Sequence, residues 1–534
     1  MSTFGNNNTK GFRKTTGFYW VILLFLISNL TFAQFNSSSF NVQFGPDIRV
    51  TKKTIIDHVI GEDAKGVYAI TQLNSKVILK YITSDLGRIK ENEVKLKLFK
   101  QELRYGGAVQ MNDAIYIFST YRDRKEKTTS LYSQKVNKDL LTLSIPKLLK
   151  SVSYEGYHSS KSASFEFKTS PDDSLLLFIT NLPTVKDKDT RFGFLILDKE
   201  MNEVWDNSEI MESDPNSEFY RMDTQVDNDG NVFLLSKITD TSKEYGRNEI
   251  DYTFKMRVYK QNTKPKHREY AVFIRGQHVT DIKFELLPGH QTQVVGFYSS
   301  DGLGQNGVFN MKYDSNFNLL TEVSKEFPTD FIVQYSSEKE RDKVTKKEEK
   351  GKGIELYAYH INQLIKNQDL TLTMVAEQYF EYVNSYTDSD GHVKNTVHYV
   401  YGDIVVVKFD LNGNVEWMEL VPKDQNTSDR GYYSSYAISQ LTDGSLVFVF
   451  NDNPKNRFAD NLNKYYTWTN NKNNTEVVLF DISLEGRMNR YVVFKGMDED
   501  VLCRPSVSLE LGDNQMLILG ESRTLMKLVK ITWE

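Results

Sequence analysis

Cysteine is almost absent from this chain, with Cys503 the single example in 534 residues. One cysteine excludes an intrachain disulfide, and with no HxxxH or HExxH spacing among the eight histidines there is no recognisable zinc site. A GxSxG nucleophile elbow is also missing. Stability must therefore come from packing, and we interpret Cys503 as a strand residue rather than a nucleophile.

Long apolar runs are equally scarce, and the one convincing example lies near the N-terminus. Phe18–Ala33 follows Lys10, Arg13 and Lys14 and ends in Thr-Phe-Ala, which predicts a secretory signal peptide over residues 1–33 and a mature start at Gln34. An uncleaved anchor is the alternative, but 16 residues are short for a span that needs roughly 20. We expect an exported protein of the periplasm, with an extracellular location as the alternative, and no transmembrane segment after cleavage.

The chain also lacks a basic excess. Its 66 Lys and Arg against 71 Asp and Glu give a formal charge of −5, and removal of residues 1–33, which hold no acidic residue, makes it −8. Nucleic-acid binding depends on neutralising phosphates, so we expect no nucleic-acid partner.

Short apolar strands separated by Asp, Asn and Gly turns are abundant, whereas long amphipathic helices are absent, and this pattern predicts an all-β fold. One strand type recurs eight times, each copy preceded by a polar or glycine-containing turn. The copies are Gly66–Ile70, Ala114–Phe118, Ser174–Ile179, Asn231–Leu235, Thr292–Phe297, Leu370–Val375, Ser445–Phe450 and Gln515–Leu519. Such a period is the first sign of a repeat architecture.

A strand–turn–strand element follows most of these strands. Its clearest copy is Tyr401–Val421, where Asp410 opens the turn and Asn412-Gly413 allows a positive φ. Related turns start at Asp85, Asp198, Asp314 and Asp481. An aspartate suits this place because its side chain accepts hydrogen bonds from backbone N–H groups two residues on.

Each unit therefore reads as four antiparallel strands, and units of this kind pack radially as a β-propeller. The last unit ends at Leu525–Trp533 without an outermost strand, and Ser39–Phe44 can supply it and close the ring. We predict one propeller of eight blades over residues 34–534. Seven blades, or two smaller β domains in tandem, are the alternatives.

Two insertions interrupt the repeat. Residues 336–353 are rich in charges of both signs and are expected to form a solvated loop or short exposed helix. Residues 382–401 are expected to form an aromatic hairpin that lies over one face of the disc and is available for ligand contact.

Two glycine- or acid-rich stretches are better explained as turns than as ligand sites. Gly302–Gly307 matches a dinucleotide fingerprint but runs into a strand, where phosphate binding needs a helix N-terminus. Asp227–Asn231 resembles the start of a calcium loop but lacks the remaining ligands. We expect no cofactor and no metal.

Candidate site residues lie at the first strand of each unit, which lines the central channel of a propeller. The residues predicted to meet at one mouth of the channel are Arg104, Tyr105, Arg221, Asp223, Asp281, Tyr433 and Arg504, with Asp57, His58, Glu166, Tyr357 and Tyr432 beside them. Aromatic faces with Arg and Asp suit a peptide or a sugar. The alternative is that these charges only pair with one another in a wet channel.

The stretches Met374–Tyr379, Tyr401–Ile404, Trp417–Gln425 and Phe448–Asn456 resemble a family of exported, uncharacterised β-propeller-like proteins of Bacteroidetes. The resemblance covers roughly residues 355–456 and implies a Gram-negative cell envelope, but it brings no activity and no site residues.

These observations favour a monomeric, non-enzymatic envelope propeller that binds a protein, peptide or glycan at the channel mouth. A carbohydrate-active enzyme, a hydrolase or lyase that uses two carboxylates among Glu166, Asp223 and Asp281, is one alternative. An assembly scaffold with a large exposed apolar patch on its rim is the other.

Overall fold

The computed structural model describes residues 40–73, 75–154, 163–182, 190–211, 217–240, 252–261, 267–300, 304–335, 338–349, 355–387, 389–458, 465–512 and 514–533. The predicted signal peptide lies outside these stretches. Within them, no helix is both long and apolar enough to cross a membrane.

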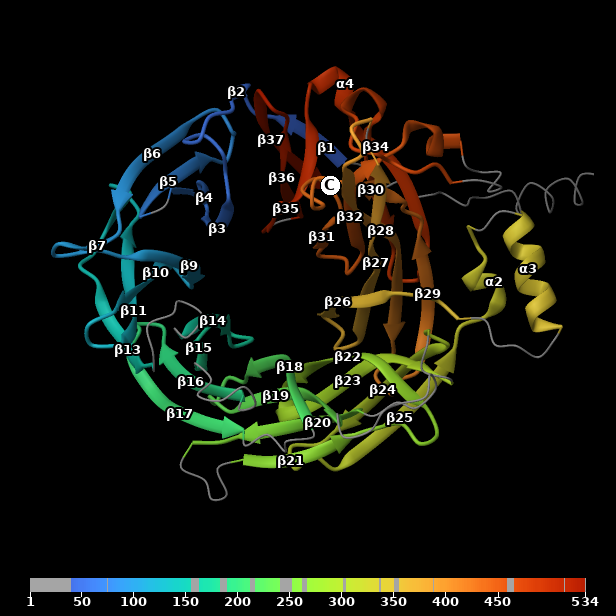
Figure 1. The fold of residues 1–534 in the computed structure, drawn as a ribbon, viewed down its shortest axis with the longest axis horizontal. Coiled ribbons are helices and arrows are strands. Elements are labelled where there is room, and N and C mark those ends of the chain that lie inside the picture. The colour runs from blue at the N-terminus through green and yellow to red at the C-terminus, as the bar shows by residue number, and fades with distance from the viewer. Residues whose placement is uncertain are drawn as a thin grey trace, which may run out of the picture.

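Eight antiparallel sheets of four main strands form a ring around a central opening (Figure 1). The sheets follow one another in chain order, and the last lies beside the first. This arrangement is a β-propeller, as predicted, and we number its blades 1 to 8 in the order of their innermost strands.

The first four blades each run from the channel outward through four strands. Blade 1 consists of β3 (His58–Asp63), β4 (Gly66–Leu73), β5 (Lys76–Thr83) and β6 (Ile89–Lys95). Blade 2 consists of β9 (Arg104–Met111), β10 (Ala114–Asp123), β11 (Thr128–Asn137) and β13 (Lys147–Ser153). Blade 3 consists of β14 (Ser164–Thr169), β15 (Leu175–Leu182), β16 (Thr190–Asp198) and β17 (Glu203–Met211). Blade 4 consists of β18 (Ser217–Val226), β19 (Val232–Asp240), β20 (Tyr252–Tyr259) and β21 (His267–Val272).

The remaining four blades follow the same order. Blade 5 consists of β22 (His278–Leu287), β23 (Gln291–Ser299), β24 (Gly307–Tyr313) and β25 (Leu319–Glu326). Blade 6 consists of β26 (Tyr359–Lys366), β27 (Leu372–Thr387), β28 (Val393–Phe409) and β29 (Val415–Val421). Blade 7 consists of β31 (Ala437–Gln440), β32 (Leu446–Asp452), β33 (Glu476–Ile482) and β34 (Met488–Lys495). Blade 8 consists of β35 (Leu502–Leu511), β36 (Gln515–Glu521), β37 (Leu525–Trp533) and β1 (Phe40–Phe44).

Short elements complete the described chain. The short strands are β2 (Ile48–Arg49), β7 (Lys97–Leu98), β8 (Gln101–Glu102), β12 (Thr142–Leu143) and β30 (Gln425–Thr427). The short helices are η2 (Pro288–His290), α2 (Thr329–Ile332), η3 (Pro454–Phe458), η4 (Lys472–Asn474) and α4 (Gly496–Glu499), and the longer α3 is Glu338–Glu348.

The N-terminal strand closes the ring, as predicted. β1 pairs antiparallel with β37, so that Phe40 lies opposite Trp533 and Val42 opposite Ile531. The ring of Phe40 also meets Tyr491 of blade 7 edge-on at 5.5 Å. β1 therefore completes blade 8 and contacts the outermost strand of the neighbouring blade.

The apolar core is divided among the blade interfaces. The buried side chains form eight clusters, and each cluster joins two adjacent blades, including blades 8 and 1. Middle strands such as β32 are buried along their whole length, whereas outer strands such as β6 alternate between partly buried and exposed residues. Eight clusters at eight interfaces agree with eight blades rather than seven.

The predicted aspartate turn forms at Asp410, whereas the one predicted at Asp481 does not: Asp481 lies within β33, and Ser483 opens the turn that follows by accepting the backbone N–H groups of Glu485 and Arg487. Asp410 Oδ1 accepts hydrogen bonds from the backbone N–H groups of Asn412 at 2.8 Å and Asn414 at 2.7 Å, and Asp410 Oδ2 accepts one from the Asn414 side chain at 3.0 Å. Gly413 has a φ of +90°, whereas Asn412 keeps a negative φ, so the turn is a type I turn followed by a left-handed residue. The same three side-chain bonds recur at Asp198, Asp227 and Asp314.

A β-bulge recurs where the innermost strand pairs with its neighbour. It lies between Val59 and Gly61 in blade 1, at Gly106 in blade 2, and between Arg221 and Asp223 in blade 4. Blades 5 and 6 have it at the corresponding places. Bulges redirect side chains, and several of the predicted site residues flank them.

The two insertions adopt the structures expected from their sequences. The described part of the charged insertion contains the helix α3. β27 and β28 extend beyond blade 6 as a hairpin that pairs Tyr382 with His398 and Thr387 with Val393. Its outer part carries exposed apolar side chains, Val383 and Tyr386 among them.

Candidate binding site at the channel mouth

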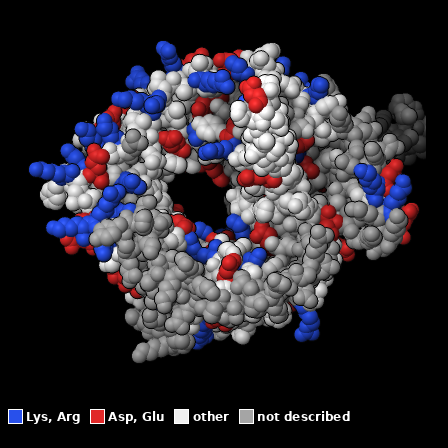
Figure 2. Space-filling model, viewed as in Figure 1, with Lys and Arg blue, Asp and Glu red and all other residues white. Residues whose placement is uncertain are grey.

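The two faces of the disc differ in what they carry. Because neighbouring strands run in opposite directions, the beginning of each innermost strand lies on the same face as the connection between the second and third strands. We call this face the mouth face, and the face with the aspartate turns the turn face. The β27–β28 hairpin and the connection between β32 and β33 both lie on the mouth face. Figure 2 shows the opening with charged side chains of both signs around it.

Predicted residues on blades 3 and 4 pair across the blade boundary. Arg221 contacts both carboxylate oxygens of Glu166, at 2.7 and 2.8 Å, while Glu166 also accepts a hydrogen bond from Asn181 at 2.8 Å. Burial opposes ionisation of Glu166, but the bonds from Arg221 and Asn181 outweigh it and lower its pKa. Asp223 forms an ion pair with Lys168. Each carboxylate is therefore paired with a cation, which suits a wet channel wall, and the lowered pKa of Glu166 argues against its use as a general acid.

Asp281, also predicted at the mouth, is hydrogen-bonded to the backbone of two blades. Its Oδ2 accepts the backbone N–H of Ile361, on blade 6, at 2.7 Å, and its Oδ1 accepts that of Ile282 at 2.9 Å. Burial raises the pKa of Asp281 in spite of these bonds. With an acceptor oxygen committed to each N–H, Asp281 links the innermost strands of blades 5 and 6.

Glu285, which was not among the predicted site residues, also lies on the innermost strand of blade 5. Burial raises the pKa of Glu285 to about 7, and the negative charge of Asp223 adds to the shift against the opposing effect of Lys366. No motif surrounds Glu285 in the sequence. The charge of Asp223 acts on Glu285 only because β18 and β22 are neighbours in the ring, so the raised pKa could not be predicted from the sequence.

The other half of the mouth carries a cluster of aromatic and charged side chains from blades 7 and 8. The guanidinium of Arg504 lies 4.2 Å from the centre of the Tyr432 ring and donates to the Ile56 carbonyl at 3.0 Å. Glu521 accepts from Arg504 at 3.3 Å and from the Tyr432 hydroxyl at 3.2 Å. Tyr433 lies edge-on to Tyr432, with ring centres 4.9 Å apart. We call this group, Tyr432, Tyr433, Arg504 and Glu521, the tyrosine–arginine corner.

Exposure differs within this corner. Arg504 and Glu521 are buried, whereas the Tyr432 residue is 37% exposed. Burial, reinforced by the charge of Glu521, raises the pKa of Tyr432 to about 12. The Tyr432 phenol therefore stays protonated near neutral pH. The buried Arg504–Glu521 ion pair supports the partly exposed Tyr432 ring.

Blades 1 and 2 continue the aromatic surface. Tyr105 stacks on His58 with ring centres 6.1 Å apart. Burial raises the pKa of Tyr105, and the charge of Asp57 adds to the shift. Asp57 also raises the pKa of Tyr432, so it lies near both rings. The structure thus brings the predicted residues of blades 1, 2, 7 and 8 together, while Arg104 is exposed at the start of β9.

The loop that carries Tyr432 and Tyr433 is held in a strained conformation. Arg430, Gly431 and Ser435 have positive φ values of +64°, +71° and +66°. A side chain at Gly431 would also collide with the Tyr401 ring, because its Cβ would lie 2.4 Å from the Tyr401 hydroxyl oxygen. Backbone strain of this kind persists only where surrounding contacts determine it.

Buried polar side chains supply those contacts. Gln425 accepts the Ser435 N–H at 2.8 Å, and Glu377 accepts the Ser435 hydroxyl at 2.8 Å. Glu377 is also paired at 2.8 Å with Lys423, whose side chain is fully buried. Asn451 donates to the carbonyls of Tyr433 at 2.8 Å and Cys503 at 2.7 Å. The loop is therefore fastened to blades 6, 7 and 8.

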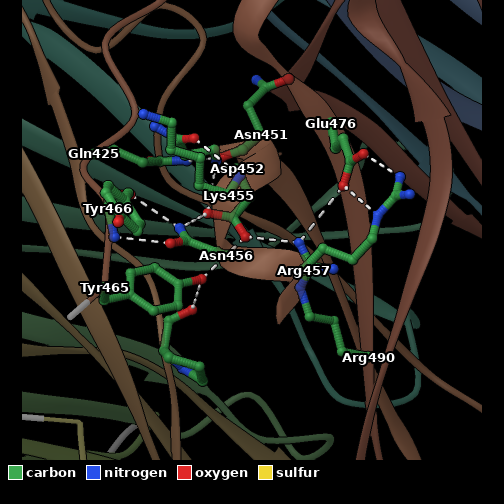
Figure 3. Close-up of polar contacts among 12 residues, drawn as sticks. Gln425, Asn451, Asp452, Lys455, Asn456, Arg457, Tyr465, Tyr466, Glu476 and Arg490 are labelled. Carbon is green, nitrogen blue, oxygen red and sulfur yellow. Dashed lines mark hydrogen bonds and ion pairs between the residues drawn. The ribbon is translucent and has the colours of Figure 1, made fainter. Parts of the chain in front are cut away.

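A second layer of polar contacts lies around these residues (Figure 3). Asp452 accepts hydrogen bonds from Asn456 at 2.7 Å and the Tyr465 hydroxyl at 3.0 Å, and pairs with Arg490 at 2.9 Å. Glu476 pairs with Arg457. Burying charges is costly unless they are paired and hydrogen-bonded, and each of these two carboxylates has a cation.

The sequence contains one signal for this network, namely the run Asn451-Asp452-Asn453 directly after the apolar strand Leu446–Phe450. Polar residues that continue a fully buried strand require partners. Those partners come from segments far apart in the sequence, so the network itself could not be predicted.

A separate pocket of about 480 Å³ opens on the turn face between blades 4 and 5. Among its lining residues, Asp227, Asp229 and His290 bring their ligand atoms within 4.8 Å of one another. His290 Nε2 lies 3.4 Å from Asp229, and Asp227 is already bonded within its own turn. These residues could hold a cation, but they serve equally as turn and ion-pair residues.

Comparison with known proteins finds only distant likenesses among solved structures. No protein-family model matches the chain, and no curated protein does. The Dos1 propeller aligns over 91% of this chain and 94% of its own with 8% identity and a TM-score of 0.40. The WD40 domain of SCAP from fission yeast aligns over 92% and 94% with 11% identity and a TM-score of 0.37. A polysaccharide lyase, an ulvan lyase, aligns over 68% and 76% with 9% identity and a TM-score of 0.32.

Proposed function

We propose that this chain is a non-enzymatic binding propeller of the cell envelope that takes a peptide or glycan chain at the tyrosine–arginine corner. The observation that supports this most strongly is the accessible Tyr432 ring in a rigidly fastened loop, next to Tyr433 and above the buried Arg504–Glu521 pair. Aromatic faces with fixed charged groups bind sugars and peptide side chains well, because little conformational entropy is lost on binding.

The pairing of the channel carboxylates favours binding over catalysis. Glu166 and Asp223 are both paired with cations, and Asp281 is bonded to two backbone N–H groups. A general acid needs a proton near neutral pH, whereas the bonds from Arg221 and Asn181 lower the pKa of Glu166.

Glycan and peptide arrays test this proposal, with a chain that starts at Gln34. Tyr432→Ala and Tyr433→Ala should each weaken binding of the array ligands, while Tyr432→Phe keeps the ring and should retain most of it. His290→Ala on the turn face is the control, and circular dichroism with urea midpoints checks that the variants fold. Unchanged binding by both tyrosine-to-alanine variants would refute the proposed site.

One observation favours the enzymatic alternative in a modified form. The pKa of Glu285 is raised to about 7 by burial, and Asp223 is close enough to contribute to that shift. A carboxyl group whose pKa is raised toward neutral can act as a general acid, and Asp223 supplies a second carboxylate nearby. If the chain cleaves any member of a polysaccharide panel, Glu285→Gln should abolish cleavage; retained cleavage would remove Glu285 from consideration.

A further inference from the structure

Basic residues are unevenly distributed along the chain. Residues 40–153, which hold β1 and blades 1 and 2, contain 20 Lys and Arg against 12 Asp and Glu, although the whole chain is acidic. Lys and Arg gather on the outer rim over β6 and β7, at the left in Figure 2. Residues 40–153 therefore carry a net positive charge on a protein of negative net charge, and part of their Lys and Arg side chains lie on this rim.

Exposed apolar side chains occupy the same rim. Over the described residues 40–154, the large apolar side chains that are exposed are Phe99 at 90%, Ile145 at 85%, Leu140 at 64% and Leu148 at 54%. All four lie on outer elements, either in the link between blades 1 and 2 or on the outer part of blade 2. Exposed apolar residues in one region of a surface indicate an interaction site.

Phe99 stands at the tip of a small hairpin that projects from the disc (Figure 1). β7 and β8 pair Lys97 with Glu102 and Leu98 with Gln101, and Phe99 turns the chain with a φ of +53°. The hairpin is anchored because Leu96 and Leu103 at its base are buried in the cluster between blades 1 and 2. Lys97 and Lys100 lie on either side of Phe99 in the sequence and are exposed.

The apolar loop of blade 2 is fixed beside β6, the outermost strand of blade 1. Lys90 of β6 donates to the Asp139 carbonyl, and Asn92 donates to the Leu141 carbonyl at 3.1 Å. Leu140 therefore lies next to β6, while Ile145 and Leu148 follow on the outside of blade 2. We call Phe99, Leu140, Ile145 and Leu148, with Lys90, Lys97 and Lys100, the basic rim.

We propose that the basic rim docks the propeller on an anionic membrane surface. A rigid hairpin with an aromatic tip between two lysines matches the interface of a bilayer, where aromatic rings sit at headgroup level and lysines reach anionic headgroups. The tip of the β7–β8 hairpin protrudes from the disc, so it suits a deformable surface such as a bilayer. Edge-on docking leaves the mouth face open, and this inference does not rest on the tyrosine–arginine corner.

Vesicle sedimentation tests the proposal with a chain that starts at Gln34, so that the apolar segment Phe18–Ala33 cannot itself bind lipid. The chain should bind phosphatidylcholine vesicles that contain phosphatidylglycerol and should bind pure phosphatidylcholine weakly. Phe99→Ala should lower the partition coefficient about tenfold. Lys97→Gln with Lys100→Gln should lower it at least about fivefold and reduce its salt dependence.

Matched controls come from other blades. Phe273→Ala removes a phenylalanine that is 64% exposed beyond β21, and Lys325→Gln with Lys495→Gln removes two exposed lysines of β25 and β34. These controls should bind as the parent chain does. Equal losses in the rim and control variants, equal binding to both vesicle types, or binding to soluble dextran sulfate without binding to anionic vesicles would each overturn the proposal.

Discussion

Single turn positions in this propeller adopt backbone conformations that their side chains disfavour. Met201, Phe317 and Leu370 have φ values of +63°, +65° and +65°, at the place in the turn where Gly413 has +90°. Left-handed φ values cost a side chain with a Cβ roughly 1–2 kcal/mol. The turn geometry therefore outweighs the preference of the residue, and glycine is the easier occupant.

The first prediction concerns Gly413→Ala. Its new Cβ would make only an ordinary contact, at 3.4 Å from the Asn310 side chain, so the cost is conformational. We expect the free energy of unfolding to fall by about 1 kcal/mol or more, measured from urea midpoints. Leu411→Ala, at a position that is 54% exposed in the same turn, is the control. Equal midpoints for the two variants would contradict the left-handed turn.

The converse change is Leu370→Asn. Leu370 is 49% exposed, so little packing is lost, and asparagine tolerates the left-handed region better than leucine does. We expect a gain of up to about 1 kcal/mol in the free energy of unfolding, visible as a higher thermal midpoint. A lower thermal midpoint would contradict this expectation, because it would show that the packing lost with the Leu370 side chain outweighs the relief of backbone strain.

Asp403 predicts a pH dependence of stability. Burial raises its folded pKa to about 7, although it accepts the Lys423 N–H at 2.8 Å. Since the unfolded pKa is about 3.9, the folded state binds more protons between these values, and the contribution of Asp403 to stability is lost as the pH rises from about 4 to about 7. Asp403→Asn should remove this slope, so its stability relative to the parent chain should rise over that range. A constant difference between variant and parent would contradict the raised pKa.

At the scale of elements, the strands and turns could be predicted because their signals are local. Alternating apolar and polar residues mark the strands, and Asp, Asn and Gly mark the turns. Asp410 and its turn needed no tertiary contact to be recognised. The bulges next to Arg221 and Asp281 depend on how two strands pair, so they could not be predicted. The exposed hairpin over residues 382–401 was predicted, but the buried network that supports the Tyr432 loop was not.

Asn451→Asp tests that network. Asn451 is buried and donates to the carbonyls of Tyr433 and Cys503, and its Oδ1 accepts the Cys503 N–H at 2.9 Å. A carboxylate has nearly the same shape but no donor, so it would face two carbonyl oxygens. We expect a loss of about 3 kcal/mol in the free energy of unfolding, measured by urea denaturation. Asn473→Asp, at an exposed position, should change little, and a similarly small effect at Asn451 would argue against the loop support.

At the scale of the whole molecule, closure is the property that unites the two ends of the described chain. The clusters between blades 7 and 8 and between blades 8 and 1 complete a ring of eight interfaces. The eight-blade count could be predicted from the repeated strand, and the closing segment Ser39–Phe44 from the strand that the last unit lacks. The sequence could not predict that the site residues divide into an ion-paired half on blades 3 and 4 and an aromatic half on blades 1, 2, 7 and 8. That division depends on which blades become neighbours in the ring.

Removal of the closing strand should weaken the whole ring. A chain that starts at Gly45 lacks Phe40, Val42 and Phe44, which pack in the cluster between blades 7 and 8. We expect the free energy of unfolding to fall by about 3 kcal/mol or more relative to a chain that starts at Gln34, measured by urea denaturation. Equal stabilities would show that β1 is dispensable for closure.

Hydrogen exchange with the strongest array ligand tests the binding site most directly. If the ligand binds at the tyrosine–arginine corner, amide protection should increase over residues 428–436 and at the start of β35, and stay unchanged over the turn-face segments 227–231 and 314–318. Protection confined to those turn-face segments would place the ligand on the opposite side of the disc and contradict the proposed site.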